Sequence, residues 1–157
     1  MEWKRISTSD RTLVDEFIRQ QWYTTTMIIR GKEIDMTQTE GFYVKEQEDI
    51  IGLITYFVSD DVLEVISLNS LRENQGIGTK LVDAVIREAK DRKLKKILVV
   101  TTNDNINAIK FYQKRGFDMA CLYHNALDIS RKIKPEIPLI GDHSIPLRHE
   151  IEFELLI

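Results

Sequence analysis

Apolar and polar positions change their period several times along the chain, and each change predicts a new element. The first apolar side chains recur at helical spacing behind the possible capping residues STSD: Leu13, Val14, Phe17, Ile18 and Trp22. We therefore expect a helix over about residues 9–22, after a short strand at EWKRIS. Residues 24–39 show no clear period, and they can accommodate a second short helix.

A β-rich pattern begins at Phe42. Three runs, FYVKEQ, IIGLITYFVS and VLEVISLNS, are separated only by the short acidic connections ED and DD. Connections of this length join neighbouring strands as hairpins. The sequence therefore predicts three consecutive antiparallel strands between residues 42 and 70.

The second half alternates helices and strands. One helical face is marked by Leu81, Val82, Val85, Ile86 and Ala89. KKILVVTT is a continuously apolar strand, NINAIKFYQKRGF is a helix with Gly116 at its C′ position, and FDMACLYH and HEIEFELLI are further strands. Residues 125–147 hold all three prolines, so we expect a long loop with at most one helical turn. The result is an α/β fold, a mixed and mostly antiparallel sheet flanked by helices, in one domain over residues 1–157.

Composition narrows the function classes. Charged residues make up 30% of the chain, and the formal net charge of -3 argues against a nucleic-acid partner. No apolar run approaches the roughly 18 residues of a membrane span, and the start MEWKRISTSD lacks the apolar core of a signal peptide, so we expect a cytoplasmic protein with no membrane partner. The single cysteine, Cys121, lies in an apolar run and is expected to be a buried core thiol.

The segment RENQGIGTKL joins a predicted strand to a predicted helix and carries Gly76 and Gly78. The first N–H groups of a helix have no internal partner, and the helix dipole adds positive potential there. Two residues without side chains would let an anion, most simply a phosphate, approach these donors. A Walker A loop and a dinucleotide fingerprint both fit the spacing poorly, whereas a tight turn that binds no ligand remains the alternative.

A second motif changes this picture. NDNINAIKFYQKRGF and ISLNSLRENQGIGTKL together resemble the GNAT superfamily of N-acetyltransferases. The family pattern N-x-x-A-x-x-x-Y-x-x-x-G-F is complete in the first stretch, at Asn105, Ala108, Tyr112, Gly116 and Phe117. The pattern [RQ]-x-x-G-x-[GA] has both glycines in the second stretch, but Glu73 stands where Arg or Gln is usual.

The resemblance implies that acetyl-CoA is the co-substrate and that its binding residues lie in three places. Ile66, Ser67 and Leu68 would pair through their backbone with the pantetheine arm, and Asn105 would hydrogen-bond the cofactor. The pyrophosphate would lie on the loop and helix start formed by Glu73, Asn74, Gln75, Gly76, Ile77, Gly78, Thr79 and Lys80. Glu73 would repel it, unless its side chain points to solvent or Arg72 or Lys80 compensates.

The resemblance assigns the chemistry to Tyr112, whose phenol can protonate or hydrogen-bond the leaving thiolate. Val62 and Val100 stand where the family often has a glutamate base. Glu64, two residues beyond Val62 and hence on the same strand face, is our first candidate base, with Glu150, His149, His143 or a water chain as alternatives. We expect no metal site, because the spacing of His143, His149 and Glu150 matches no standard ligand pattern.

The implied function is transfer of acetyl from acetyl-CoA to an amine by direct attack in a ternary complex. The acceptor is a small-molecule or peptide amine, and residues 24–39 and 125–147 are expected to border its site. The alternative is a non-catalytic acetyl-CoA-binding sensor, which the unusual Glu73 and the missing base favour. Dimers are common in the family, so a homodimer is among the expected assemblies, with the final strand EFELLI pairing across its interface.

Overall fold

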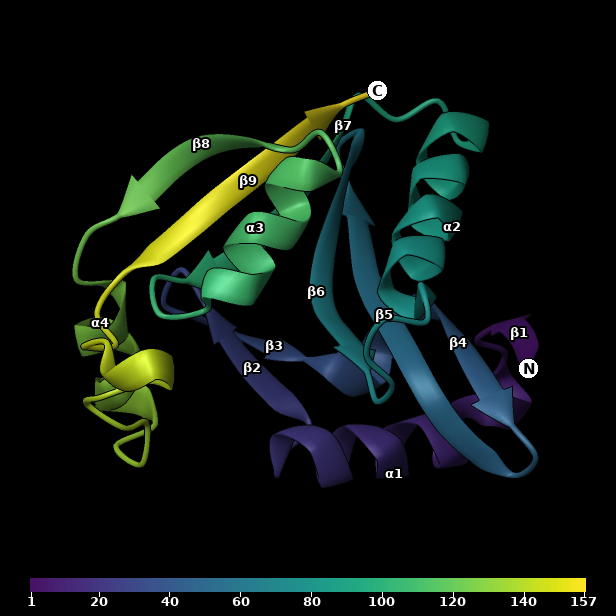
Figure 1. Ribbon diagram of the computed structural model, residues 1–157, viewed down its shortest axis with the longest axis horizontal. Helices are drawn as coiled ribbons and strands as arrows, with labels where there is room; N and C mark the ends of the chain where they lie inside the picture. The colour runs from purple at the N-terminus through teal and green to yellow at the C-terminus, as the bar shows by residue number, and fades with distance from the viewer. The chain divides into compact units, whose positions relative to one another are not determined.

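The computed structural model describes residues 1–157, and Figure 1 labels its helices and strands. These residues fall into two compact units. The first unit contains residues 1–27, 35–97 and 157. The second contains residues 28–34 and 98–156. No helix is both long enough and apolar enough to cross a membrane.

The first unit is built on an antiparallel sheet with the strand order β1-β4-β5-β6. Its strands are β1 (Glu2–Arg5), β4 (Glu40–Glu46), β5 (Asp49–Ser59) and β6 (Val62–Ser70). The three consecutive strands read from the sequence are therefore confirmed, as are the two short connections between them.

Two long helices belong to this unit. α1 (Arg11–Trp22) follows a 3-10 turn at Thr8–Asp10 and buries Val14, Phe17 and Ile18. α2 (Ile77–Asp91) packs on β4, β5 and β6 through the predicted apolar face. The contact is close at Gly52, where an added Cβ would come within 2.5 Å of the Ile77 side chain. This packing fixes the position of the α2 start at the end of β6.

Residues 24–39 do not form the short helix that their ambiguous pattern allowed. They form β2 (Thr26–Ile29) and β3 (Lys32–Asp35), followed by a 3-10 turn at Met36–Gln38. The turn residues Arg30 and Gly31 both have positive φ, 51° and 75°. Two successive left-handed residues make the turn that joins twisted hairpin strands, and the β-branched run before them suits a strand.

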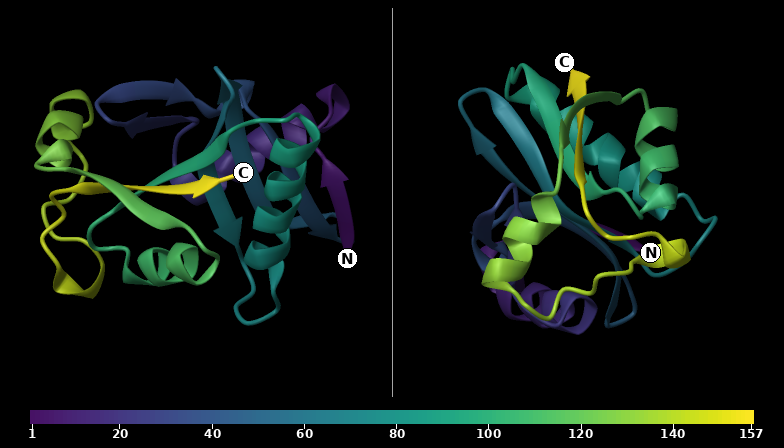
Figure 2. Two further views of the ribbon diagram at one scale, coloured as in Figure 1. Left: turned by 90° about the horizontal axis from the view of Figure 1, so that it is seen from above. Right: turned by 90° about the vertical axis from the view of Figure 1, so that its left-hand side faces the viewer.

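The second unit has the strand order β7-β9-β8, with β7 (Lys96–Thr102) running into it from the first unit. β8 (Asp118–Tyr123) pairs antiparallel with β9 (Glu150–Leu156), and Figure 2 shows the two side by side. β9 thus has a strand on each side, and the expectation that it pairs across a dimer interface is wrong. The free edge belongs to β8.

In this unit the predicted end of one helix is confirmed, whereas the predictions of a long loop and of a buried cysteine are corrected. α3 (Ile106–Lys114) ends as predicted, with Gly116 at a φ of 92°. The long loop contains an eight-residue helix, α4 (Ala126–Ile133), whose buried side packs with Leu147. Cys121 is exposed rather than buried, because its apolar run lies on the edge strand.

Candidate functional site

The glycine loop ends in an open helix start. Gly76 is the N-cap of α2, with φ 72° and ψ 12°, and no side chain caps the helix there. An added Cβ at Gly76 would meet nothing within 4 Å. The N-cap residue thus places no side chain over the first turn of α2 and leaves open space where a Cβ would lie, which suits an anion at a helix N-terminus.

Neither Arg72 nor Lys80 is arranged to compensate the charge of Glu73. Glu73 is exposed. Arg72 forms its ion pair with Glu46, at 2.6 Å, and the Lys80 ammonium lies 5.3 Å from the centre of the Trp3 ring. Since Glu73 points to solvent, its carboxylate lies near the helix start without filling it, and solvent and salt screen its charge.

Strand β6 carries an irregularity that the sequence did not reveal. Ser67 lies opposite Thr55 and Val65 lies opposite Tyr56, so Ile66 is an extra residue in the ladder. A bulge leaves the backbone of the extra residue without its ladder partner, and bulges are frequent beside active sites. The side chain of Ser67 is committed elsewhere, since its hydroxyl lies 2.6 Å from that of Thr55 in the buried interior. The Ser67 hydroxyl is therefore not free to bind a ligand.

Glu64 lies on the same strand, before the bulge. The register places Val62 opposite Ser59 and Glu64 opposite Phe57, so these two β6 residues share a face as expected. Glu64 is partly exposed. It stays a candidate base.

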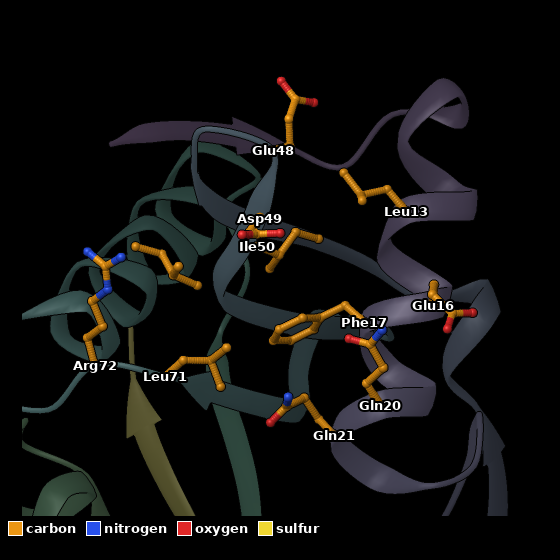
Figure 3. A pocket seen from close by; sticks show the side chains of 11 residues that line it. Leu13, Glu16, Phe17, Gln20, Gln21, Glu48, Asp49, Ile50, Leu71 and Arg72 are labelled. Atoms are coloured by element: carbon orange, nitrogen blue, oxygen red, sulfur yellow. The ribbon is translucent and has the colours of Figure 1, made fainter.

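A pocket of about 450 Å³ lies elsewhere in the first unit, between α1, the β4–β5 turn and the residues that follow β6 (Figure 3). Phe17, Ile50 and Leu71 give it an apolar floor, and Glu48 and Arg72 stand at its rim. None of the predicted site residues lines it, although Arg72 directly precedes the glycine loop.

In the second unit, Tyr112 is 5% exposed and sits among aromatic rings. The rings of Phe117 and Phe153 lie 5.5 Å and 5.9 Å from it, centre to centre. Burial raises the pKa of the Tyr112 phenol above its usual value of 10. The hydroxyl therefore stays protonated at neutral pH, as a hydrogen-bond donor must.

Asn105 is the N-cap of α3. Its side-chain oxygen accepts a hydrogen bond from the Ala108 backbone N–H at 3.2 Å. An asparagine amide also carries two N–H donors, which this bond does not use. The residue can thus close its own helix and still donate to a ligand.

The alternative bases differ in what their acceptor atoms already bind. The His149 Nδ1 accepts the Asn125 backbone N–H at 2.8 Å, so the proton of the neutral ring lies on Nε2 and neither nitrogen is free to take another. Glu150 is buried and accepts the Arg30 backbone N–H at 3.0 Å. His143 is exposed, with a left-handed backbone. No three His, Cys, Asp or Glu side chains are grouped so that they could hold a metal ion.

A charged network on β9 was missed by sequence reasoning. The Tyr123 hydroxyl donates to Glu152 Oε1 at 3.0 Å, and Arg30 Nη1 approaches the same oxygen at 3.3 Å. Burial, together with the Glu152 carboxylate, raises the pKa of Tyr123. The alternation HEIEFE could have suggested one polar face of the strand, but the contact with Arg30 depends on the unexpected β2–β3 hairpin.

Comparisons with known proteins agree with this architecture. The protein YxbD of Bacillus subtilis (strain 168) is 41% identical over 142 residues, which is 90% of this chain and 89% of YxbD. Two solved structures share the fold. One is described as an IAA acetyltransferase from Bacillus cereus ATCC 14579 (TM-score 0.71, 18% identity, 99% of both chains). The other is a GNAT family acetyltransferase from Elizabethkingia anophelis with acetyl-CoA bound (TM-score 0.70, 21% identity, 99% of this chain and 97% of that one).

The family model described as "Acetyltransferase (GNAT) family" matches residues 4–117. These residues include both motifs, the glycine loop before α2 and the Asn-to-Phe pattern around α3. The resemblance and the fold class expected from the sequence are therefore confirmed, and the chain belongs to the GNAT family of acetyltransferases.

Proposed function

We propose that this protein transfers the acetyl group of acetyl-CoA to an amine. Membership of the GNAT family makes acetyl-CoA the co-substrate. The single observation that carries the proposal in this chain is the start of α2, where the N-cap Gly76 has no side chain and open space surrounds the position a Cβ would take. A pyrophosphate suits such a site because its charge and its oxygen acceptors match the helix dipole and the backbone N–H groups of a first helical turn.

The remaining cofactor contacts that we propose lie on β6 and at the start of α3. The backbone of Ile66–Leu68, irregular at the bulge, would pair with the amide-bearing pantetheine arm and hold the thioester oxygen. The Asn105 side chain would donate an N–H while its oxygen caps α3. Glu73, facing solvent, would weaken the affinity slightly without blocking the site.

Tyr112 would act as a hydrogen-bond donor to the leaving thiolate. In the reaction the amine nitrogen bonds to the acetyl carbon, the carbon–sulfur bond breaks, and the proton lost by the attacking amine balances the one gained by the thiol. Burial places the pKa of Tyr112 further above the value of about 8.5 typical of a thiol. Complete transfer of the phenol proton to the thiolate is therefore unfavourable in free energy. Stabilising the thiolate by a hydrogen bond from the phenol avoids this cost.

The amine must lose a proton before it attacks. Glu64 is our proposed base, because it is a partly exposed carboxylate on β6, the strand that carries the bulge. His149 is the weakest alternative, since its only lone pair is already used by Asn125. The polar network of Arg30, Tyr123 and Glu152 is our candidate for acceptor recognition.

Thiol release from acetyl-CoA over a panel of amines tests the function. The panel contains a polyamine, an aminoglycoside, free amino acids and peptides with a free N-terminus or lysine. We expect one class to gain a single acetyl group by mass spectrometry. Tyr112→Phe should lower kcat about 10- to 100-fold and leave acetyl-CoA affinity within twofold. Tight acetyl-CoA binding with no turnover on any amine would instead support the sensor alternative.

A further inference from the structure

Asp104 is a buried carboxylate with no role in the reaction proposed so far. It is 6% exposed and lies between β7 and α3, directly before Asn105. A buried carboxylate is unfavourable unless hydrogen bonds satisfy it. The Thr102 hydroxyl donates to its Oδ1 at 2.5 Å, and the Asp142 backbone N–H donates to its Oδ2 at 2.9 Å. The second donor lies 38 residues further along the chain, so this bond joins two separate segments.

The segment that Asp104 reaches is a loop, residues 139–147, which is closed by its own backbone. The Leu147 N–H donates to the Leu139 carbonyl at 2.9 Å across its base. Gly141 makes room for the carboxylate, because an added Cβ there would lie 2.1 Å from Asp104 Oδ2. The loop and the carboxylate are therefore fitted to one another, and any larger residue at this position would displace the carboxylate.

Asn103 binds the other end of the same loop. Its Oδ1 accepts the backbone N–H groups of Arg148 and His149, at 3.0 Å and 2.9 Å. Its Nδ2 donates to the Pro146 carbonyl at 2.9 Å. Two neighbouring side chains at the β7–α3 junction thus hold the loop, and the next residue is Asn105, the proposed donor to acetyl-CoA.

The loop is also in contact with the network that we propose for acceptor recognition. Leu147 belongs to a small buried cluster with Ala126 and Leu127, and Tyr123 packs against this cluster. The Tyr123 hydroxyl donates to Glu152. A displacement of the loop would therefore disturb the side chains of this network.

We propose that Asp104 is a positioning residue, which fixes residues 139–148 to the junction that carries Asn105 and so couples acetyl-CoA binding to order on the acceptor side. This inference rests on the proposed function. Acetyl-CoA bound at Asn105 restrains the adjacent Asp104 and, through it, the loop. Two ligands that order the same segment favour one another, because the entropy of ordering is lost only once. Acetyl-CoA then prepares the site for the amine.

Hydrogen exchange of the intact chain, followed by mass spectrometry of peptides covering residues 139–148, tests the proposal with acetyl-CoA as the probe. Without ligand, Asp104→Ala should speed exchange about tenfold, because the Asp142 N–H loses a charged acceptor. Saturating acetyl-CoA should slow exchange about fivefold in the wild type and leave Asp104→Ala unchanged.

The outcomes separate this inference from the proposed function. Wild-type protein that binds acetyl-CoA without slower exchange in the loop overturns the inference alone. Equal slowing in Asp104→Ala also overturns it, since the ligand would then act on the loop by another route. Wild-type protein that fails to bind acetyl-CoA in calorimetry overturns the proposed function and the coupling with it.

Three further variants test the contact itself. Gly141→Ala displaces the carboxylate from the side of the loop, so it should reproduce both effects of Asp104→Ala. Asp104→Asn keeps an oxygen for the Asp142 N–H and should exchange like the wild type. Asp142→Ala is the matched control, because it removes an exposed carboxylate of the same loop and keeps the N–H. Fast exchange in Asp142→Ala equal to that in Asp104→Ala overturns the assignment to Asp104.

Kinetics distinguish positioning from stability alone. On the amine that the panel identifies, Asp104→Ala should raise the acceptor KM about tenfold and keep kcat within twofold, because the loop is misplaced while the reacting groups are intact. The Asp104→Ala, Gly141→Ala double variant should raise KM no further than either single change, since both break one contact. A lower kcat with unchanged KM, as expected if part of the protein were unfolded, overturns the positioning role.

Discussion

Helix starts in the two units of the molecule differ in how their first turns are satisfied. In the first unit, α2 begins after Gly76, which has no side chain to cap the helix and open space where a Cβ would lie. In the second, the Asn105 side chain accepts the Ala108 N–H in the first turn of α3, and the Leu127 N–H in the first turn of α4 donates to the Arg148 backbone oxygen at 3.0 Å. A helix normally satisfies its first donors locally, because each orphaned donor costs stability. The open N-cap position of α2 therefore suits a ligand, whereas the starts of α3 and α4 are satisfied by local structure.

Putting a charge into the open helix start should have the largest effect on ligand binding. Gly76→Asp has room for the added Cβ, since nothing lies within 4 Å of it, but the φ of 72° strains any side chain there and the carboxylate would stand beside the pyrophosphate. Repulsion at about 5 Å in a partly exposed site costs roughly 2 kcal/mol, or about 30-fold in the acetyl-CoA Kd by calorimetry.

Gly76→Asn is the matched control for that variant. Asparagine tolerates the positive φ of 72° and has nearly the shape of aspartate, but it carries no charge. It should keep most of the affinity. Equal losses in the two variants would mean that side-chain bulk, not charge, closes the site, and unchanged binding in both would remove the phosphate role of the loop.

The features that could be predicted from sequence are those that depend on local chemistry. Glycines at the strand–helix junction predicted the open start of α2, and Gly116 predicted the end of α3. The period of the apolar runs predicted β4, β5 and β6, together with their antiparallel pairing. In each case the signal and the structure lie within a few residues of one another.

The features that escaped prediction depend on distant partners. The apolar pattern of residues 119–122 is the same for a central and an edge strand, so the exposure of Cys121 could not be read from it. The bulge at Ile66 exists only relative to β5. α4 was hidden by the nearby prolines, and its buried side is defined by packing with Leu147, twenty residues further on.

Asn105 tests whether a closed helix start can also serve a ligand. Asn105→Ala removes both the cap and the amide donors, so it should lower the free energy of unfolding by about 1 kcal/mol and weaken acetyl-CoA binding about tenfold. Asn105→Asp keeps an oxygen for the Ala108 N–H and loses the donors, so urea melts should be nearly unchanged while binding still falls. If both variants bind acetyl-CoA like the wild type, Asn105 is a cap and nothing more.

Removing the exposed charge beside the open start should have a smaller effect. Glu73→Gln should tighten acetyl-CoA binding about threefold at low ionic strength, because the carboxylate repels the pyrophosphate only through solvent. The gain should fade in calorimetric titrations at 0.5 M salt. Glu48→Gln is the control, an exposed carboxylate on the β4–β5 turn. An equal gain in the control would assign the effect to net charge rather than to the position of Glu73.

The smallest expected effect lies just before α4, where His149 Nδ1 accepts the backbone N–H of the N-cap residue Asn125. Burial, the stacked His124 and the adjacent Arg148 lower the pKa of His149, and Asp128 opposes them only weakly. A histidine whose folded pKa is depressed stabilises the fold above its unfolded value of about 6.5, and this stability is lost as pH falls from there through the folded pKa. Protonating Nδ1 also breaks its hydrogen bond from Asn125, worth about 1 kcal/mol or less. Urea melts between pH 7.5 and 5 should therefore show a loss of stability that His149→Asn reduces. The exposed His143→Asn should not reduce it, and equal pH slopes in all three proteins would show that protonation of His149 does not cause the loss.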